Sequence, residues 1–142
     1  MAVRILQSNP EIRQRYARRF QHVLVDEFQD TNAVQYRFMQ LISSHHNNIF
    51  VGGDEDQSIY RWRGADYRNV LAFEEDYAEQ KILLEQNYRS TQVILDAARA
   101  VIDRNTQRTP KALFTERRGG EKITLYEAVN DYAEADYVAA TI

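Results

Sequence analysis

HVLVDEFQD, residues 22–30, joins a short apolar and β-branched run to two adjacent carboxylates. Such a run is typical of a buried parallel strand with polar residues at its C-terminal tip. Runs of the same kind occur at 49–51, 82–84 and 123–126. Apolar residues at helical spacing predict helices from Ser8 through Phe20, across 34–42, weakly across 66–78, across 91–104, and from Asp131 onward. The sequence therefore alternates predicted strands with predicted helices.

This alternation predicts an α/β fold with right-handed crossovers and a parallel sheet. Ligands of such sheets bind at the C-terminal ends of the strands. Three polar clusters follow predicted strands directly, at 26–32, 53–65 and 85–91. These clusters are the candidate functional segments.

Composition narrows the class of protein. The chain has 142 residues, 44% hydrophobic and 27% charged, with a net charge of −3, values typical of a globular domain. No Cys is present, which excludes disulfides and thiolate metal sites and fits a reducing compartment. No apolar run approaches the ~20 residues that cross a bilayer. We expect a cytoplasmic protein without membrane partners.

Most of the basic residues are arginines. Fifteen of the 18 are Arg, whose planar guanidinium binds phosphate and stacks on bases. A lineage preference for Arg would give the same count. The net charge alone does not indicate that the chain binds nucleic acid.

The first cluster contains Asp26 and Glu27, at the tip of the strand in residues 22–25. A Walker B site has this construction: one carboxylate holds hydrated Mg²⁺ beside nucleotide phosphates, and a second polarises the attacking water. The alternative is a pair of surface acids at a strand end. Gln29 and Asp30 favour the functional interpretation, because an amide and a carboxylate are costly to place at a buried strand tip.

The second cluster combines acids with aromatic and basic residues. Residues 54–57 (DEDQ) can face a phosphate or form a metal site. Tyr60 and Trp62 then alternate with Arg61 and Arg63. In an extended segment the two rings would point one way and the two Arg the other. This pattern is typical of a surface that stacks single-stranded nucleic acid, and the alternative is a pair of core aromatics.

The third cluster, residues 84–90 (LEQNYRS), leads from a predicted strand into a helix. Arg89 could reach a γ-phosphate as an arginine finger, and Tyr88 could stack on a base. The alternative is a surface Arg beside a half-buried Tyr.

Three of these stretches, 25–32 (VDEFQDTN), 53–66 (GDEDQSIYRWRGAD) and 84–90, closely resemble motifs II, III and IV of superfamily 1 DNA helicases of the UvrD, PcrA and Rep type. Their order and spacing agree with the family, and the resemblance extends from about residue 9 to the end. It implies a partial RecA-like (P-loop NTPase) fold. Residues 1–84 would be the C-terminal part of the first motor domain, and 85–142 the start of the second.

The resemblance also implies residue roles. Asp26 resembles the Mg²⁺ ligand, and Glu27 the general base for ATP hydrolysis. Gln57 resembles the γ-phosphate sensor. The other implied roles are adenine packing for Tyr88, the arginine finger for Arg89, DNA binding for Tyr60, Trp62 and Arg63, and membership of the network between the two sites for Gln29 and Asp30.

One family feature is missing. No Gly is followed by the Lys-Ser or Lys-Thr of a P-loop. We therefore expect an internal piece of an ATP-driven, 3′→5′ DNA helicase or translocase, inactive by itself. Its expected partners are ATP, Mg²⁺, single-stranded DNA, duplex junctions and the remaining motor-domain segments. Two alternatives stay open: a stand-alone single-strand-binding module without ATPase activity, and the motor part of a helicase–nuclease.

Overall fold

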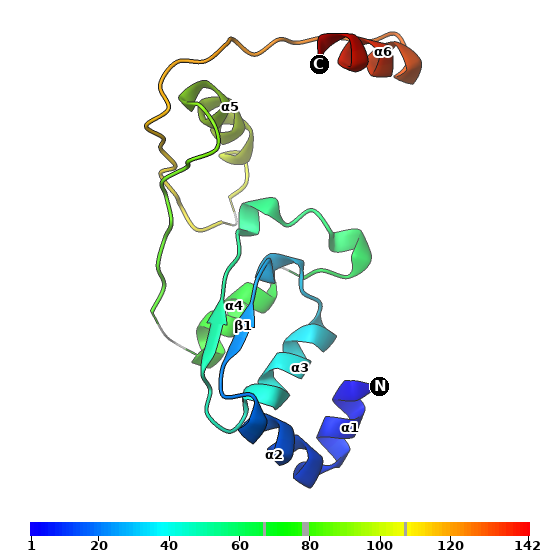
Figure 1. Ribbon diagram of the computed structural model, residues 1–142, viewed down its shortest axis with the longest axis vertical. Helices are drawn as coiled ribbons and strands as arrows, with labels where there is room; N and C mark the ends of the chain where they lie inside the picture. Colours follow the sequence, from blue (N-terminus) through cyan, green and yellow to red (C-terminus); the bar gives the residue numbers. More distant parts are fainter. Residues whose placement is uncertain (67, 78–79, 107) are drawn as a thin grey trace. The chain divides into compact units, whose positions relative to one another are not determined.

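The computed structural model describes residues 1–66, 68–77, 80–106 and 108–142 (Figure 1). The chain divides into two compact units. The first is Met1–Ile82 with Gln107–Thr109, and the second is Leu83–Thr106 with Pro110–Ile142. Each unit is described by itself.

The first unit carries both strands and most of the helices. Its elements are α1 (Ala2–Ser8), α2 (Pro10–Arg19), β1 (Val23–Val25), η1 (Phe28–Asp30), α3 (Ala33–Ser43), β2 (Ile49–Val51), η2 (Glu55–Gln57), η3 (Arg61–Arg63) and α4 (Arg68–Tyr77). The second unit contains α5 (Gln92–Ile102) and α6 (Asp131–Thr141).

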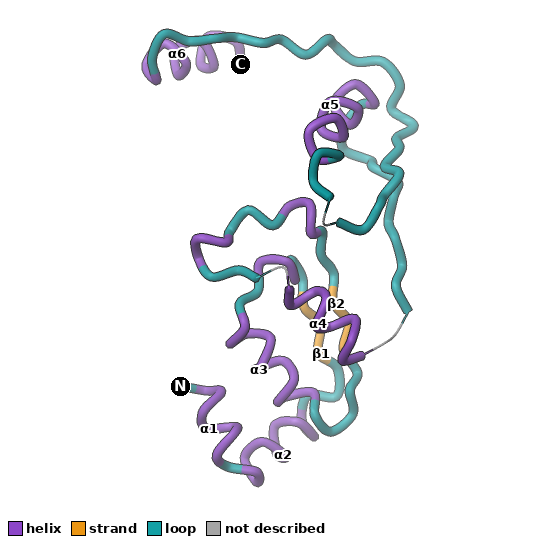
Figure 2. Tube along the Cα trace, turned by 180° about the vertical axis from the view of Figure 1, so that it is seen from behind, coloured by secondary structure: helices purple, strands orange, loops and turns teal. Residues whose placement is uncertain are grey.

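β1 and β2 form a parallel pair, with Val23 opposite Ile49 and Val25 opposite Val51. The two strands lie side by side in Figure 2, and α3 connects them in sequence. This β–α–β arrangement confirms the predicted mixture of helices with a parallel sheet. In the part of the chain that the structure describes, the sheet has only these two strands.

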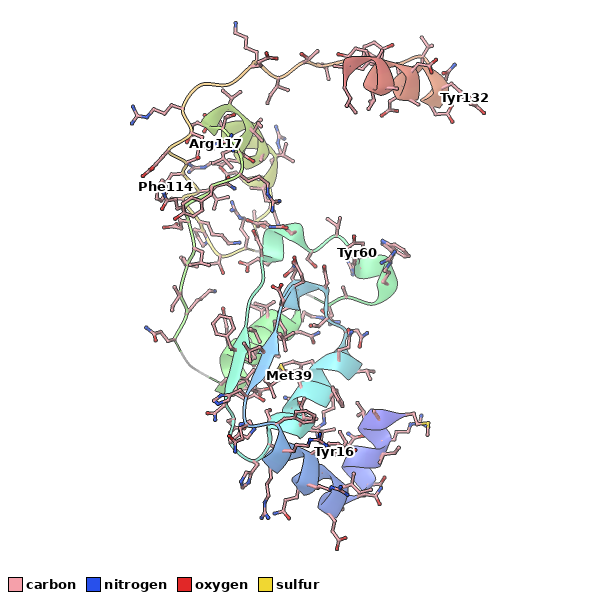
Figure 3. The ribbon with its side chains drawn as sticks, viewed as in Figure 1. Tyr16, Met39, Tyr60, Phe114, Arg117 and Tyr132 are labelled. Atoms are coloured by element: carbon pink, nitrogen blue, oxygen red, sulfur yellow. The ribbon has the colours of Figure 1, made fainter. Side chains whose placement is uncertain are left out.

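One face of the sheet carries the core. Val23, Phe28, Tyr36 and Met39 form its buried centre, with α4 supplying partly buried residues. Met39, labelled in Figure 3, is 4% exposed. Leu24 and Phe50 on the opposite face are 74% and 66% exposed. β1 is therefore buried on one face only, and the expectation of a buried strand is wrong for its other face.

Asn32 determines where α3 begins. Its side chain accepts hydrogen bonds from the backbone N–H groups of Val34 and Gln35, while the Gln35 side chain accepts from the Asn32 N–H. This reciprocal pair is a capping box, which satisfies donors that an uncapped helix leaves exposed. Because the cap fixes the start of α3 at Ala33, residues 26–31 form a short connection between β1 and α3.

Several predicted elements differ from the structure. Residues 82–84 and 123–126 are irregular, and an isolated bridge between Gln86 and Phe114 lies near the first of them. Leu84 and Leu125 are 87% and 94% exposed, so these runs lack the neighbouring strands that would bury them. Ser8 ends α1, which was not predicted, and the helix predicted from Ser8 begins at Pro10 as α2.

The remaining predicted helices are present with shifted ends. The helix expected across 66–78 is α4, and its predicted positions 67 and 78 lie outside the described residues. The helix expected across 91–104 is α5, and the last helix begins at Asp131 as predicted.

Candidate functional site

The polar residues after β1 and β2 meet at one edge of the sheet. The Gly52 N–H donates to the Val25 carbonyl at 2.8 Å, and the Phe28 N–H donates to the Gly52 carbonyl at 3.0 Å. These bonds join the two chain segments just beyond the strands. Two of the predicted clusters, 26–32 and 53–65, therefore lie together at the strand ends.

Asp26 and Glu27 both remain exposed at this edge. The Asp26 Oδ1 accepts a hydrogen bond from the Glu27 N–H at 2.9 Å. Glu27 has φ 48° and ψ 44°, a left-handed conformation that few residues other than Gly adopt. Such strained backbone is concentrated at functional sites. The two carboxylates also lie along a groove of about 480 Å³ between β1 and α3.

Gln29 connects the end of β1 to the end of β2. Its side chain is 1% exposed. The Nε2 donates to Glu27 Oε2 at 2.7 Å, and the Oε1 accepts from the Asp54 N–H at 3.0 Å. A Cβ on Gly53 would lie 2.7 Å from that Oε1, so a side chain at this position would force the amide to shift. Gln29 thereby fixes one oxygen of Glu27.

The acidic turn, residues 54–57, extends these contacts. Asp54 Oδ1 accepts from the Asp56 N–H, and Asp54 Oδ2 accepts from Gln57 Nε2, both at 3.0 Å. Gln57 itself is exposed at the end of η2. We call the chain of contacts through Glu27, Gln29, Asp54 and Gln57 the strand-end network.

The acidic turn does not form a clustered metal site. Among the described residues, no group of three or more His, Asp or Glu gathers as it would around an ion. Asp56 instead binds the guanidinium of Arg108 through both of its oxygens. Asp26 fits Mg²⁺ differently, as a single exposed carboxylate, because Mg²⁺ keeps most of its waters and needs only one or two protein carboxylates.

Tyr60, Trp62 and Arg63 form what we call the aromatic–arginine cluster. The expectation that residues 60–63 are extended is wrong, because Arg61–Arg63 form the 3-10 helix η3. The turn brings Arg63 over both rings, with its Cζ 4.9 Å from the Tyr60 centroid and 4.4 Å from the Trp62 centroid. Arg63 therefore lies on the same side as the Tyr60 and Trp62 rings instead of pointing away from them.

Exposure decides between the two interpretations of these aromatics. Trp62 is 74% exposed and Tyr60 37% exposed, so neither is a core residue. Tyr60, labelled in Figure 3, lies on a loop outside the sheet. The cluster presents an aromatic surface and a cation to solvent, the combination that stacks on nucleic-acid bases.

Tyr88 and Arg89 belong to the second unit and are both exposed. The Asn87 side chain shapes their turn, since its Oδ1 accepts from the Arg89 N–H at 3.0 Å and the Ser90 N–H at 2.7 Å. Tyr88, 76% exposed, donates its hydroxyl to Gln86 Oε1. The Arg89 backbone carbonyl accepts a hydrogen bond from Arg117 Nη1.

Sequence patterns missed Arg108, whose side chain forms a shielded ion pair with Asp56 of the acidic turn. It lies in a polar loop that carries no periodicity and matches none of the three motifs. The nearby Pro110 indicates a turn at Arg108, but no feature of the neighbouring sequence indicates that Arg108 pairs with Asp56, 52 residues earlier.

A small parallel sheet with paired acids at its strand ends is typical of nucleotide-binding α/β proteins. Comparison with known families identifies the family. Residues 1–78 match the model of the UvrD/REP helicase N-terminal domain, and residues 82–142 match that of the UvrD-like helicase C-terminal domain. The chain belongs to the UvrD/REP helicase family.

The chain is similar to individual members of this family along nearly its whole length. It is 50% identical to an ATP-dependent DNA helicase PcrA of Staphylococcus epidermidis and 49% identical to one of Staphylococcus aureus. Each alignment spans 141 residues, 99% of this chain and 19% of the relative. The chain thus spans about a fifth of the length of these relatives. In the described ranges, no helix has the length and apolar character to cross a membrane.

Proposed function

We propose that this chain is part of an ATP-dependent DNA helicase or translocase that moves 3′→5′ on single-stranded DNA and unwinds duplexes. Its fold would be a partial RecA-like fold, with 1–84 from the first motor domain and 85–142 from the second. The polarity is taken from the family. The longer protein implied here, called the parent below, would work in the cytoplasm with its DNA and ATP.

The strand-end network carries this proposal. It links the Glu27 carboxylate through buried Gln29 to the turn that holds Gln57, using hydrogen bonds of 2.7–3.0 Å. A hydrolytic carboxylate and a phosphate-sensing amide must respond to the same nucleotide. A direct chain of hydrogen bonds between them meets that requirement.

The carboxylates would divide the hydrolytic chemistry. Asp26 would hold Mg²⁺, which when bound neutralises phosphate charge. Glu27 would accept a proton from the attacking water at Oε1, because Gln29 already donates to Oε2. The buried amide therefore orients the base before the nucleotide arrives, and general-base catalysis depends on that geometry.

The remaining residues would bind ATP and DNA. Gln57 would contact the γ-phosphate, and Tyr60, Trp62 and Arg63 would bind single-stranded DNA three to six residues further along the chain. Tyr88 would pack on adenine, and Arg89 would act as the arginine finger. The short connection from Gln57 to Tyr60 gives a covalent route between the two ligands.

A second candidate is a single-strand-binding module without ATPase activity. Two observations favour it: the aromatic–arginine cluster is exposed, and the 142 residues contain no P-loop motif. A nuclease domain elsewhere in the parent would instead favour a helicase–nuclease.

Substitution of the two carboxylates in the parent tests the proposal. Glu27→Gln should lower DNA-stimulated kcat by about 10²–10⁴ while ATP still binds, the usual range for loss of a general base. Asp26→Asn should instead weaken Mg²⁺-dependent nucleotide binding. Phosphate release and binding of a fluorescent ATP analogue measure the two effects.

Glu11→Gln, at an exposed position of helix α2, is the matched control and should leave both measurements unchanged. Small and equal effects of Glu27→Gln and Asp26→Asn would contradict the assigned roles. Single-strand binding without any ATP turnover in the parent would favour the second candidate.

A further inference from the structure

The acidic turn is held by a chain segment that no motif includes. Arg108 donates from Nε to Asp56 Oδ1 at 3.0 Å and from Nη2 to Asp56 Oδ2 at 2.8 Å. The next residue, Thr109, donates its backbone N–H to Glu55 Oε1 at 2.5 Å. Two consecutive residues therefore bind two consecutive acids of η2.

This contact differs from an ordinary surface ion pair. The Arg108 and Asp56 side chains are only 11% and 12% exposed. By contrast, the pairs Arg68–Asp66, Lys81–Glu74 and Arg99–Asp103 each have at least one partner whose side chain is more than 40% exposed. A shielded, bidentate arginine–carboxylate pair is directional as well as attractive, because the planar fork matches the two oxygens.

The segment that provides Arg108 is itself tethered. Lys81 Nζ donates to the Thr109 hydroxyl at 2.9 Å and pairs with Glu74 Oε1 of α4 at 2.5 Å. Arg108 and Thr109 therefore belong to a segment of the first unit that is bonded to α4 through Lys81. Arg108 and Thr109 thus hold the two acids of η2, and Gln29 holds the Asp54 N–H that precedes them.

Gln57 lies next to these contacts in the chain. It follows Asp56 directly, and its amide is bonded to Asp54. We infer that Arg108 is a positioning residue: through Asp56 it holds the acidic turn so that the Gln57 amide faces the γ-phosphate. This inference rests on the proposed function and adds to it a residue outside the three motifs.

Arg108→Gln and Asp56→Asn in the parent test the inference. Each should lower DNA-stimulated kcat by about tenfold to a hundredfold, since small misplacement of a positioned group can cost that much. ADP affinity should stay unchanged, because ADP has no γ-phosphate for Gln57 to sense. The affinities for single-stranded DNA, measured with a non-hydrolysable ATP analogue and with ADP, should become more nearly equal than in the unsubstituted parent.

Coupling between the two residues separates positioning from a general loss of structure. The double variant should be no worse than either single variant, and the exchange Asp56→Arg with Arg108→Asp should recover part of kcat. Arg108→Lys, which keeps the charge and loses the fork, should have an intermediate effect. Arg104→Gln, an exposed Arg on the same connection, is the matched control and should leave kcat unchanged.

Failure of this inference can be distinguished from failure of the proposed function. If Glu27→Gln abolishes turnover while Arg108→Gln and Arg108→Lys behave like Arg104→Gln, the positioning role is overturned and the function stands. A lower melting temperature for the Arg108 variants with unchanged kcat below melting would also overturn it. If Glu27→Gln leaves turnover intact, the proposed function itself fails.

Discussion

At the scale of single residues, Gln29 illustrates how a buried amide can organise exposed groups. Burying an amide without partners costs free energy, so its hydrogen bonds must be satisfied. Gln29 satisfies its donor with Glu27 and its acceptor with the Asp54 N–H. A buried amide with satisfied hydrogen bonds therefore connects the proposed base to the turn proposed to sense phosphate.

Trp62 is the residue whose role can be tested most directly. Trp62→Ala in the parent should cost about 1–3 kcal/mol of single-strand binding, the usual value for loss of a stacked base. It should reduce unwinding and DNA stimulation far more than DNA-free ATP hydrolysis. Fluorescence anisotropy of a labelled oligonucleotide measures the binding change, and Trp62→Phe, which keeps an aromatic ring, should lose less.

The same residue reports binding in this chain by itself, because it is the only Trp. Since Trp62 is 74% exposed, its emission should be that of a solvated indole, and oligonucleotide should quench it. Blue-shifted emission insensitive to DNA, with an alanine variant that fails to fold, would remove the aromatic–arginine cluster from the proposed DNA site.

At the scale of elements, a polar contact ties α3 to α4 beside the core. The Tyr36 hydroxyl donates to Asp76 Oδ2 at 2.5 Å, and Gln40 Nε2 donates to the same oxygen at 2.7 Å. Phe28 adds an edge-to-face contact with Phe73 of α4, at 5.5 Å between ring centroids. α4 is thus attached to α3 at its polar rim and to the core at its apolar face.

This contact predicts a pH dependence of stability. Burial, followed by the hydrogen bond and charge of Asp76, raises the pKa of Tyr36 well above its ordinary value of about 10. The protonated hydroxyl is therefore favoured in the folded state. Its contribution to the free energy of unfolding is complete below pH 10 and is lost as pH rises toward the folded pKa.

Tyr36→Phe should lower the free energy of unfolding by about 1.5–3 kcal/mol at pH 7, the range for a hydrogen bond to a charged group. The difference from the unsubstituted protein should shrink above pH 10. Urea unfolding at pH 7 and pH 11 measures both values. Tyr132→Phe, at a position 79% exposed, is the control, and a pH-independent difference for Tyr36→Phe would refute the linkage.

At the scale of the whole chain, the 142 residues contain no phosphate cradle, and this predicts their isolated activity. We expect no DNA-stimulated ATP hydrolysis, because the roles proposed for Asp26 and Glu27 require phosphates that a P-loop must first hold. Phosphate release by the isolated chain, with and without single-stranded DNA, measures this. Turnover above background that Glu27→Gln abolishes would show that the nucleotide site has been misassigned.

Much of the organisation was predictable because it depends on local pattern. The apolar run before Asp26 predicted β1, and its two acids predicted a polar strand tip. The short strand at 49–51 and the helices α3 and α5 also follow from local periodicity. The runs at 82–84 and 123–126 carry the same local signal but form no strand, since a strand needs a neighbour as well as a propensity.

The sequence by itself determined the α/β class, the family through its three motifs, and the position of the acids after each strand. Only the tertiary structure decided that Gln29 is the buried link, that residues 60–63 turn so that Arg63 covers both rings, and that Arg108 holds Asp56. The physical reason is range. Periodicity and strand-tip chemistry lie within a few residues, whereas burial and the Asp56–Arg108 pair depend on segments up to 52 positions apart that only the folded chain brings together.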